Sequence, residues 1–409
     1  MIDLHLFEFP LNLIAAAAFL LAAALVASKP QGRSAVSDVL GGRTFSVVLL
    51  LSAALLMAVE GSFGLEIEHT AGFAAFVLLL MLSLSIVTVR NVRSRRPLPS
   101  VLSHGGLLLI LFTGFFGAPD FIDARLVAIR EEASHIAVNT RAEAVPLPFD
   151  VRLEEFEVDC YPDGVSPKQY SSTLDINGER HVTSVNHPCR VDGFLIYQSG
   201  YDTENGRYSV LKVVRDPWLP FVLLGMAVLA AGALLELRKT WNNRAVLPAA
   251  LVLAVLFGFI SLARINLGTL APALRSFWFV PHLIIYMLAY SLMALSLVLG
   301  IISFFVKRPL LRLSGKLLRT SSSLLLLGML CGAVWAKAAW GDYWTWDPKE
   351  CWAAATWLLT LAGTHLPEAK GRLAFVASVL ISFLAMQMTW YGVNYLPSSE
   401  NSMHTYNSK

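Results

Sequence analysis

The sequence predicts an all-α polytopic membrane protein of about ten transmembrane helices, with one β-rich external domain inserted. Hydrophobic residues make up 56% of the 409 residues and the mean hydropathy is +0.59, which is too apolar for a soluble protein of this length. Apolar runs of membrane length recur along the chain, and short basic clusters lie beside them. One long polar segment interrupts this pattern.

The predicted spans follow from length, because a helix needs about 17 to 25 apolar residues to cross hydrocarbon. They lie at residues 10–28, 44–62, 71–89, 101–118, 217–236, 245–263, 279–305, 320–338, 352–368 and 373–396. The residues before the first run carry no Lys or Arg, and no clear small-residue cleavage site follows it. We therefore interpret the first run as a retained span and not as a cleaved signal peptide.

The basic clusters predict the orientation, because short cytoplasmic loops collect Lys and Arg. Every alternate loop is basic, which gives a single solution with both termini outside. The clusters contain Lys29, Arg33 and Arg43; Arg90, Arg93, Arg95 and Arg96; Arg238, Lys239 and Arg244; Lys307, Arg308, Arg312, Lys316 and Arg319; and Lys370 with Arg372. They form no continuous stripe and the net charge is only +3, which argues against nucleic acid as a partner.

The polar segment from about 119 to 216 is predicted to be an external β-rich domain. Apolar and polar residues alternate from Phe149 to Val158, and Asn177-Gly178 is a type I′ hairpin signal between two strand-like runs. The segment carries more acids than bases. Two roles stay open for it, a solvated domain without a site of its own and a docking surface for a partner protein.

Two cysteines, Cys160 and Cys189, fall in this external segment. On the oxidising side of a membrane they are candidates for a disulfide. Nothing in the sequence shows that they lie close together, so the pairing stays open.

The densest chemical signal is a tryptophan-rich segment. Six of the ten tryptophans lie in the 23 residues from Trp335 to Trp357, together with acidic and basic side chains. Tryptophan gathers at membrane interfaces, but a belt does not explain so compact a loop, where indole N–H groups and aromatic faces suit the edge of a planar ligand. The predicted ligand-binding residues are Trp340, Trp344, Trp346, Asp347, Pro348, Lys349, Glu350 and Trp352.

Four of the nine histidines fall into two layers of matched depth. Ionisable groups in membrane spans are costly and usually face the bundle interior. His282 begins the seventh span at its outer end, and His404 lies in the outer tail beyond the tenth, on the side of the tryptophan segment. His104 lies near the cytoplasmic end of the fourth span, and His365 near the inner end of the ninth.

The two layers are too far apart to share one metal ion. At about 1.5 Å per helical residue, His365 lies roughly 20 Å along its span from Trp352. We therefore predict an outer site at His282 and His404 and an inner site at His104 and His365. Neutral imidazole is a common axial ligand of haem iron, so the pattern favours two bis-histidine haem b sites over isolated interface histidines.

These residues support a resemblance to a known family. The stretch WGDYWTWDPKECW resembles the WWD domain of haem-handling proteins of cytochrome c maturation, most closely the CcsA branch. That branch has an external histidine before the WWD segment, another after the last span, and a transmembrane histidine on the helix after the segment. The matching positions here are His282, His404 and His365.

Upstream, HGGLLLILFTGFFGA, NHPCRVDGFLIYQSGYD and SVLKVVRDPWLPFVLLGMAVLAAGALL resemble the CcsB (ResB) family, whose transmembrane histidine corresponds to His104. The chain therefore resembles a CcsB–CcsA fusion, a system II cytochrome c synthase. The expected divisions are a CcsB-like bundle of about four helices at 1–118, the external domain at 119–216, a CcsB-like closing helix with a cytoplasmic loop at 217–244, and a CcsA-like domain at 245–409 with its WWD segment at about 335–357.

The resemblance implies a cytochrome c haem lyase in a bacterial cytoplasmic (inner) membrane. Haem would move from the inner to the outer site, where the WWD loop holds it on the periplasmic side and thioether bonds form to the CXXCH segment of apocytochrome c. Because this chain has no CXXC of its own, thiol-reducing proteins are expected as separate partners, beside membrane lipid. Catalysis would be mostly positioning, so no catalytic residue is assigned beyond the haem-holding ones.

Two departures from the family pattern stand out. The external domain is short for the CcsB family, and Cys351 stands where the WWD motif usually carries a hydroxyl residue. Two other functions stay open: a haem exporter or chaperone that forms no bonds, and a b-type haem protein that transfers electrons.

Overall fold

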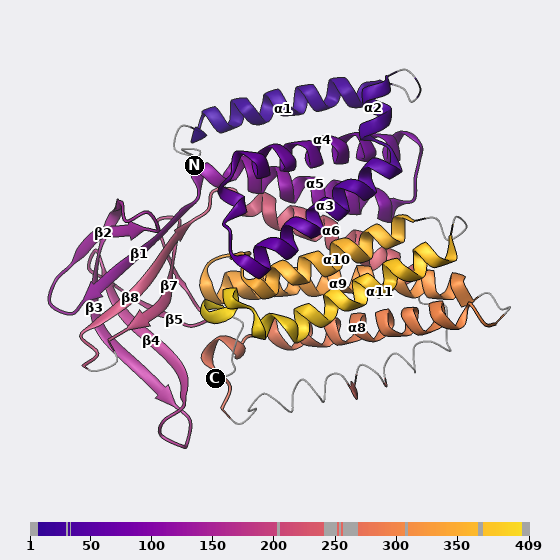
Figure 1. The fold of residues 1–409 in the computed structure, drawn as a ribbon. Coiled ribbons are helices and arrows are strands. Elements are labelled where there is room, and N and C mark those ends of the chain that lie inside the picture. Colours follow the sequence, from indigo (N-terminus) through magenta and orange to yellow (C-terminus); the bar gives the residue numbers. More distant parts are fainter. Residues whose placement is uncertain are drawn as a thin grey trace.

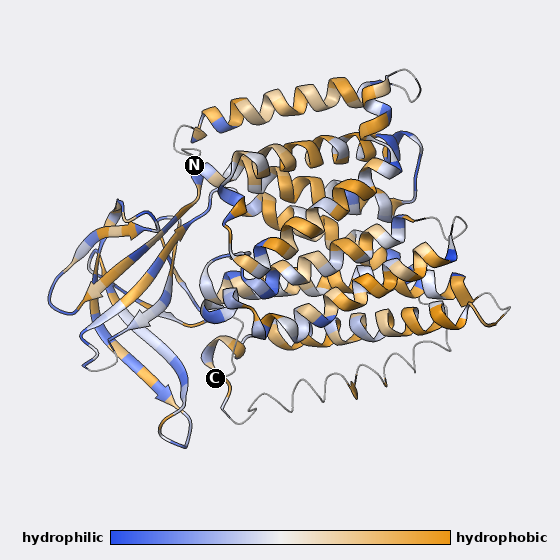
Figure 2. Ribbon diagram, viewed as in Figure 1, coloured by the Kyte–Doolittle hydropathy of each residue, from blue (hydrophilic) through white to orange (hydrophobic). Residues whose placement is uncertain are grey.

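The computed structural model describes residues 7–29, 32, 34–202, 205–240, 252, 255–256, 269–306, 310–366 and 371–402. Figure 1 shows a bundle of long helices with a β-sheet domain at one end. The helices are apolar along most of their length, whereas polar residues concentrate in the sheet domain and near the ends of the bundle (Figure 2).

Among the described residues, eight helices are long and apolar enough to cross a membrane. They are α1 (Leu11–Ser28), α3 (Arg43–Phe63), α4 (Ala71–Arg93), α5 (Leu98–Gly117), α6 (Leu219–Thr240), α8 (Phe279–Ile302), α9 (Leu310–Trp340) and α11 (Arg372–Trp390). Each lies on a predicted span. The predicted span at 245–263 lies outside the described residues, so the expected count of ten is not established.

The predicted span at 352–368 forms helix α10 (Pro348–His365), which is not among these eight. Its first turn carries Lys349 and Glu350, and these charges lower its hydropathy. It nevertheless packs inside the bundle against α3, α9 and α11. Short elements complete the helical part: α2 (Ala35–Leu40), η2 (Ile67–His69), η3 (Ala118–Asp120), η4 (Pro272–Leu274), η6 (Gly392–Tyr395) and η7 (Pro397–Asn401).

Helix α9 is longer than the sequence indicated, since it begins at Leu310 and not near 320. At about 1.5 Å per residue its 31 residues exceed the roughly 30 Å of hydrocarbon, so the helix extends beyond a membrane. Arg312, Lys316 and Arg319, expected in a loop, lie on its first turns. Hydropathy marks where hydrocarbon ends and not where the helix begins, which accounts for the difference.

Glycines bring α5 and α6 into close contact. A Cβ added at Gly106 of α5 would lie 2.6 Å from the backbone nitrogen of Leu229, and one at Gly232 would lie 2.8 Å from the backbone nitrogen of Ser103. Small residues allow such close approach in membranes, where packing and not the hydrophobic effect holds helices together. This contact fixes the helix that carries His104.

The external domain is one antiparallel sheet of eight strands with the order β5-β4-β3-β2-β1-β8-β7-β6. The strands are β1 (Ile122–Ile129), β2 (Ser134–Asn139), β3 (Ala144–Cys160), β4 (Pro167–Ile176), β5 (Glu179–Ser184), β6 (Cys189–Val191), β7 (Phe194–Tyr201) and β8 (Tyr208–Arg215). The sheet curls so that its two ends meet, and the hydroxyl of Thr183 in β5 donates a hydrogen bond to the carbonyl of Ile196 in β7.

Local sequence patterns predicted two features of this sheet correctly. Asn177 and Gly178 both have positive φ, 52° and 87°, as a type I′ turn between β4 and β5 requires. In β3, alternate residues from Leu147 to Leu153 are buried. The pairing of Cys160 with Cys189, which the sequence left open, is not formed: both thiols are free and half-buried.

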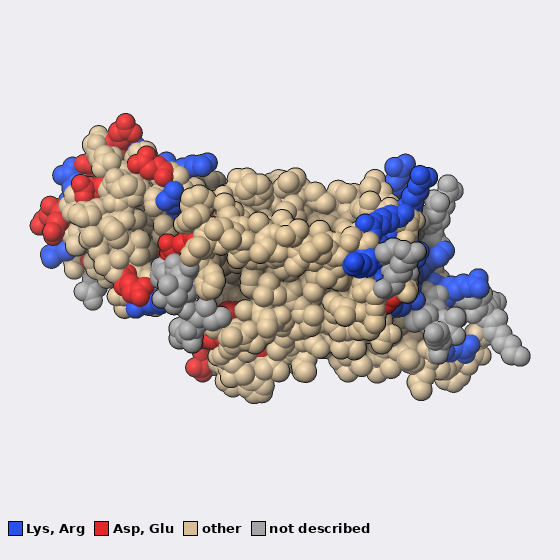
Figure 3. All heavy atoms as spheres, turned by 90° about the horizontal axis from the view of Figure 1, so that it is seen from above, with Lys and Arg blue, Asp and Glu red and all other residues tan. Residues whose placement is uncertain are grey.

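Lys and Arg gather at the end of the bundle that lies away from the sheet domain (Figure 3). The sheet domain itself carries both signs of charge. Arg90 near the end of α4 pairs with Asp38 at 2.7 Å, and Arg93 donates to the carbonyl of Ala27 at 3.0 Å, so part of this basic end is tied to α1 and α2.

Candidate functional site

The tryptophan-rich segment folds as a helix, a loop and a second helix. Helix α9 ends at Trp340, Gly341 turns the chain with a φ of 88°, and α10 begins at Pro348. Asp347 caps α10, because its Oδ1 accepts a hydrogen bond from the backbone N–H of Lys349 at 2.8 Å. Trp346 has a φ of 59° in the loop, a left-handed conformation that is uncommon outside glycine.

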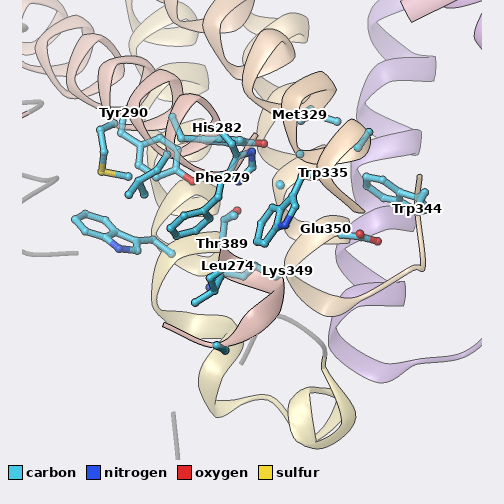
Figure 4. A pocket seen from close by; sticks show the side chains of 18 of the residues that line it. Leu274, Phe279, His282, Tyr290, Met329, Trp335, Trp344, Lys349, Glu350 and Thr389 are labelled. Carbon is cyan, nitrogen blue, oxygen red and sulfur yellow. The ribbon is translucent and has the colours of Figure 1, made fainter. Parts of the chain in front are cut away.

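A cavity of about 470 Å³ opens beside this loop. Helices α8, α9, α10 and α11 line it together with the segment before α8, and most of its lining is apolar. Cofactor pockets span roughly 300 to 1,000 Å³, so this cavity has the size of a cofactor site. Figure 4 shows His282, Trp335, Trp344, Lys349 and Glu350 around the same space.

The position of His282 is fixed by the neighbouring helix. Its Nδ1 lies 2.8 Å from the carbonyl oxygen of Gly328 in α9. The ring packs between Tyr286 and Trp335, with centroid distances of 4.8 and 5.8 Å. A Cβ added at Gly332 would lie 2.8 Å from Cε1 of His282, so the ring needs glycine there.

Three of the eight predicted ligand-binding residues line the cavity: Trp344, Lys349 and Glu350. The carboxylate of Glu350 also holds the loop, because its Oε2 accepts from the backbone N–H of Thr345 at 2.7 Å and from its hydroxyl at 3.1 Å. Trp340 lies behind the cavity wall and packs on Trp335 at 5.3 Å.

The other four predicted residues do not line the cavity. Trp346 packs edge-on against Phe73 of α4 at 5.4 Å. Asp347 and Pro348 are buried at the start of α10, where they form the helix cap and first position. Trp352 packs toward α3, and its indole N–H is buried without a hydrogen-bond partner among the described residues.

Sequence reasoning missed other residues of the cavity wall. Phe279, Tyr286 and Tyr290 line it from α8, and Tyr343 lines it from the loop. His282, Tyr286 and Tyr290 are spaced by four residues and therefore share one face of the helix. This spacing was a signal in the sequence that the cavity continues below the histidine.

The inner histidines lie on two helices at the basic end of the bundle. Nδ1 of His104 in α5 lies 2.7 Å from the carbonyl oxygen of Ser100, and Nδ1 of His365 at the end of α10 lies 2.8 Å from that of Leu361. Both rings are half-buried. Nδ1 of each ring thus bonds within its own helix, and the pairing of the two histidines stays a prediction.

His404 lies outside the described residues. The described chain ends two residues earlier at Ser402, whose hydroxyl donates a 2.6 Å hydrogen bond to Oδ2 of Asp347. The tail therefore reaches the tryptophan-rich loop. Among the described residues, no group of three or more His, Cys, Asp or Glu side chains is arranged to hold a metal ion by itself.

Comparisons with known proteins divide the chain into two regions. Residues 96–207 match the ResB-like family, and residues 219–399 match the family described as Cytochrome C assembly protein. The second region begins at the closing helix α6, which the sequence analysis grouped with the CcsB-like part.

Curated relatives match only a part of the chain. A "Cytochrome c biogenesis protein CcsA" of Oryza sativa is 47% identical over 90 residues, 21% of this chain and 26% of the relative. Relatives of that name from Chlamydomonas reinhardtii and Guillardia theta are 31% and 30% identical over 156 and 174 residues, in each case 34% of this chain. The matches span 44% and 56% of these two relatives, so the chain covers about half of their length.

The helices and the family matches indicate a multi-pass membrane protein that is similar to proteins of cytochrome c biogenesis. One chain therefore holds a region that matches the ResB-like family and a region that matches the Cytochrome C assembly protein family. This is the combination of a CcsB–CcsA fusion, as the sequence predicted.

Proposed function

We propose that this protein is a system II cytochrome c haem lyase, which moves haem b to the outer face of a bacterial cytoplasmic membrane and attaches it to apocytochrome c. One observation carries the proposal. A cavity of cofactor size brings His282 together with Trp344, Lys349 and Glu350 of the WWD segment. Haem is the substrate of this reaction.

The chemistry of the cavity fits a porphyrin. The hydrogen bond at Nδ1 of His282 leaves iron to approach through Nε2, and such bonds set the tautomer and orientation of metal-binding imidazoles. A porphyrin supplies four nitrogen ligands to the iron, so two histidines complete its coordination and no larger cluster of protein ligands is needed. The aromatic walls would contact the ring, and Lys349 would be the cation that meets a propionate.

The contact between Ser402 and Asp347 supports His404 as the second outer ligand. His404 follows Ser402 by two residues in the sequence, so this contact lies close in the chain to the proposed ligand. Asp347 then acts on the site through the chain and not by touching haem.

The inner pair supports a holding site before transfer. His104 and His365 each use Nδ1 for a carbonyl on their own helix, so Nε2 would be the nitrogen that meets a ligand. Lys and Arg gather at the end of the bundle away from the sheet domain (Figure 3), and by the positive-inside rule this supports a cytoplasmic side for the inner pair and an outer side for the cavity and the sheet domain.

The bond-forming step balances without a leaving group. Each S–H of the CXXCH segment adds across one haem vinyl, so that sulfur bonds to the carbon next to the ring and hydrogen goes to the terminal carbon. The protein's part is to hold the ring with its vinyls exposed, which raises the effective concentration of thiol against vinyl. Apocytochrome c and separate thiol-reducing proteins are the partners of this step.

Co-expression with an apocytochrome tests the proposal. Covalent haem on the partner supports a lyase. Haem transferred without thioether bonds indicates an exporter or chaperone. If haem is not transferred at all and the protein retains it, the result indicates a b-type electron carrier. Either of the last two outcomes overturns the lyase.

Outer ligation is tested with His282→Gly. The variant is expected to abolish holocytochrome formation, and added imidazole is expected to restore part of it by replacing the lost ligand. His69→Gly serves as the control, because His69 is 55% exposed and lies outside both layers. Failure of imidazole to rescue a folded variant would count against axial ligation.

A further inference from the structure

The turn that leads into the WWD loop rests directly on the sheet domain. Gly341 has a φ of +88°, and a Cβ added there would lie 3.1 Å from Val214 of β8 and 3.2 Å from the ring of Tyr197 in β7. Glycine is therefore required at position 341 for two reasons: the backbone has a positive φ, and the sheet domain leaves no room for a Cβ.

An ion pair joins the same two parts. Lys212 of β8 lies between Asp123 of β1, at 3.1 Å, and Asp342 of the loop, with which it forms a short hydrogen bond. The Lys212 and Asp342 side chains are only 14% and 16% exposed. Burial raises the pKa of Asp342 and the charge of Lys212 partly offsets this rise, so the pair is a desolvated contact unlike a surface salt bridge.

A second lysine secures the turn from the other side. Lys337 of α9 is buried, and its Nζ donates to the carbonyl of Gly341 at 2.8 Å. The ammonium group lies 5.5 Å from the ring centre of Phe121 and 5.1 Å from that of Tyr343. Phe121 leads into β1 and Tyr343 lines the cavity, so the contact links the root of the sheet to the cavity wall.

The sheet domain also contacts the segment before α8, which forms another part of the cavity wall. The Tyr161 hydroxyl donates to the carbonyl of Leu270 at 3.1 Å, and the Asn186 amide donates to that of Pro272 at 2.9 Å. Leu270 and Leu274 line the cavity. Two separate parts of the sheet therefore contact two separate walls of the cavity.

We propose that the sheet domain holds the walls of the outer haem cavity in position. Lys212 is the positioning residue, and it acts by fixing Asp342 of the loop. This inference rests on the proposed function, because it assigns the domain a task in holding haem. It differs from both roles that the sequence left open, since a solvated domain or a docking surface needs no buried ion pair to the loop.

The test measures how fast haem leaves the purified full-length protein into excess apomyoglobin. Two kinetic phases of haem loss are expected, one from each site. The outer phase is identified as the phase that is missing in His282→Gly. Lys212→Met is expected to accelerate this phase about tenfold and leave the inner phase unchanged, while Lys212→Arg restores the slow rate. Asp342→Asn, which keeps the side-chain shape, is expected to act in the same direction and to add little to Lys212→Met.

Arg152→Met is the matched control, because Arg152 pairs with Asp175 at 2.6 Å within the sheet and does not line the cavity. If haem leaves the outer site at the native rate in both Lys212→Met and Asp342→Asn, the positioning role of the sheet domain is wrong, and the proposed haem lyase function is unaffected. A native protein that holds no haem overturns the proposed function instead. If Lys212→Met does not fold, Asp342→Asn alone decides the question.

Discussion

The outer and inner histidines are held in different ways. The ring of His282 bonds to a carbonyl of the neighbouring helix α9 and fits against Gly332. The rings of His104 and His365 bond to carbonyls four residues earlier in their own helices. The outer ring therefore depends on how two helices pack, whereas each inner ring is oriented by its own helix and only the distance between them depends on packing.

The largest effect is expected from Gly332→Ala. The added methyl would lie 2.8 Å from Cε1 of His282 and 2.9 Å from Nδ1, so the ring must leave its position. Absorption spectra of the purified protein should lose the outer haem and keep the inner one. Gly114→Ala in α5 is the control, because a Cβ there meets no atom within 4 Å. Retention of the outer haem would show that packing does not fix this ring.

A smaller loss is expected at the inner site. His104→Ala or His365→Ala removes one of two ligands, so each should lower the inner haem content several-fold. The double variant should lose little more, because both residues serve one iron. Haem content per protein, measured as the pyridine haemochrome, checks this expectation. Additive losses would mean that the two histidines serve different ligands.

A modest effect is expected from Trp344→Ala. An aromatic contact contributes about 0.5–1.5 kcal/mol beyond burial, so outer haem should dissociate roughly twofold to thirteenfold faster. Trp352→Ala is the matched comparison, because Trp352 packs toward α3 and away from the cavity. It should lower thermal stability in detergent and leave haem dissociation unchanged. Equal effects of the two variants on haem dissociation would indicate that the segment is an interfacial aromatic belt and not a haem site.

The smallest effect is expected from Cys351→Ser. The thiol is fully buried and donates to the carbonyl of Trp346 at 3.4 Å, a bond that a hydroxyl also makes. Haem dissociation should change less than twofold, and the family's usual hydroxyl would be restored. A large change would show that the sulfur contributes more than this hydrogen bond.

Local patterns in the sequence predicted much of this fold. Asn177 and Gly178 marked a hairpin because only a few residues accept positive φ, and the apolar runs marked helices because hydrocarbon demands their length. The pattern also placed His282 beside the WWD loop. It gave no sign of the tertiary contacts that decide which residues face the cavity.

Asp347 and Trp352 illustrate this limit. Their types suit a ligand site, yet Asp347 caps a helix and Trp352 faces another one. The direction of a side chain in a loop depends on φ values such as that of Trp346, and composition does not specify them. The contact of Lys212 with Asp342 likewise joins residues 130 apart, which no local pattern reveals.

The close approach of α3 to α10 has a consequence for how the chain is assembled. A Cβ at Gly61 would lie 2.8 Å from that of Cys351, and the Ser398 hydroxyl donates to the carbonyl of Gly61 at 2.8 Å. The amino-terminal and carboxy-terminal halves thus recognise each other through side-by-side helices. Two polypeptides encoded by separate genes should reassemble into the same bundle, whereas Gly61→Leu should disrupt the packing of α3 on α10 even within one unbroken chain.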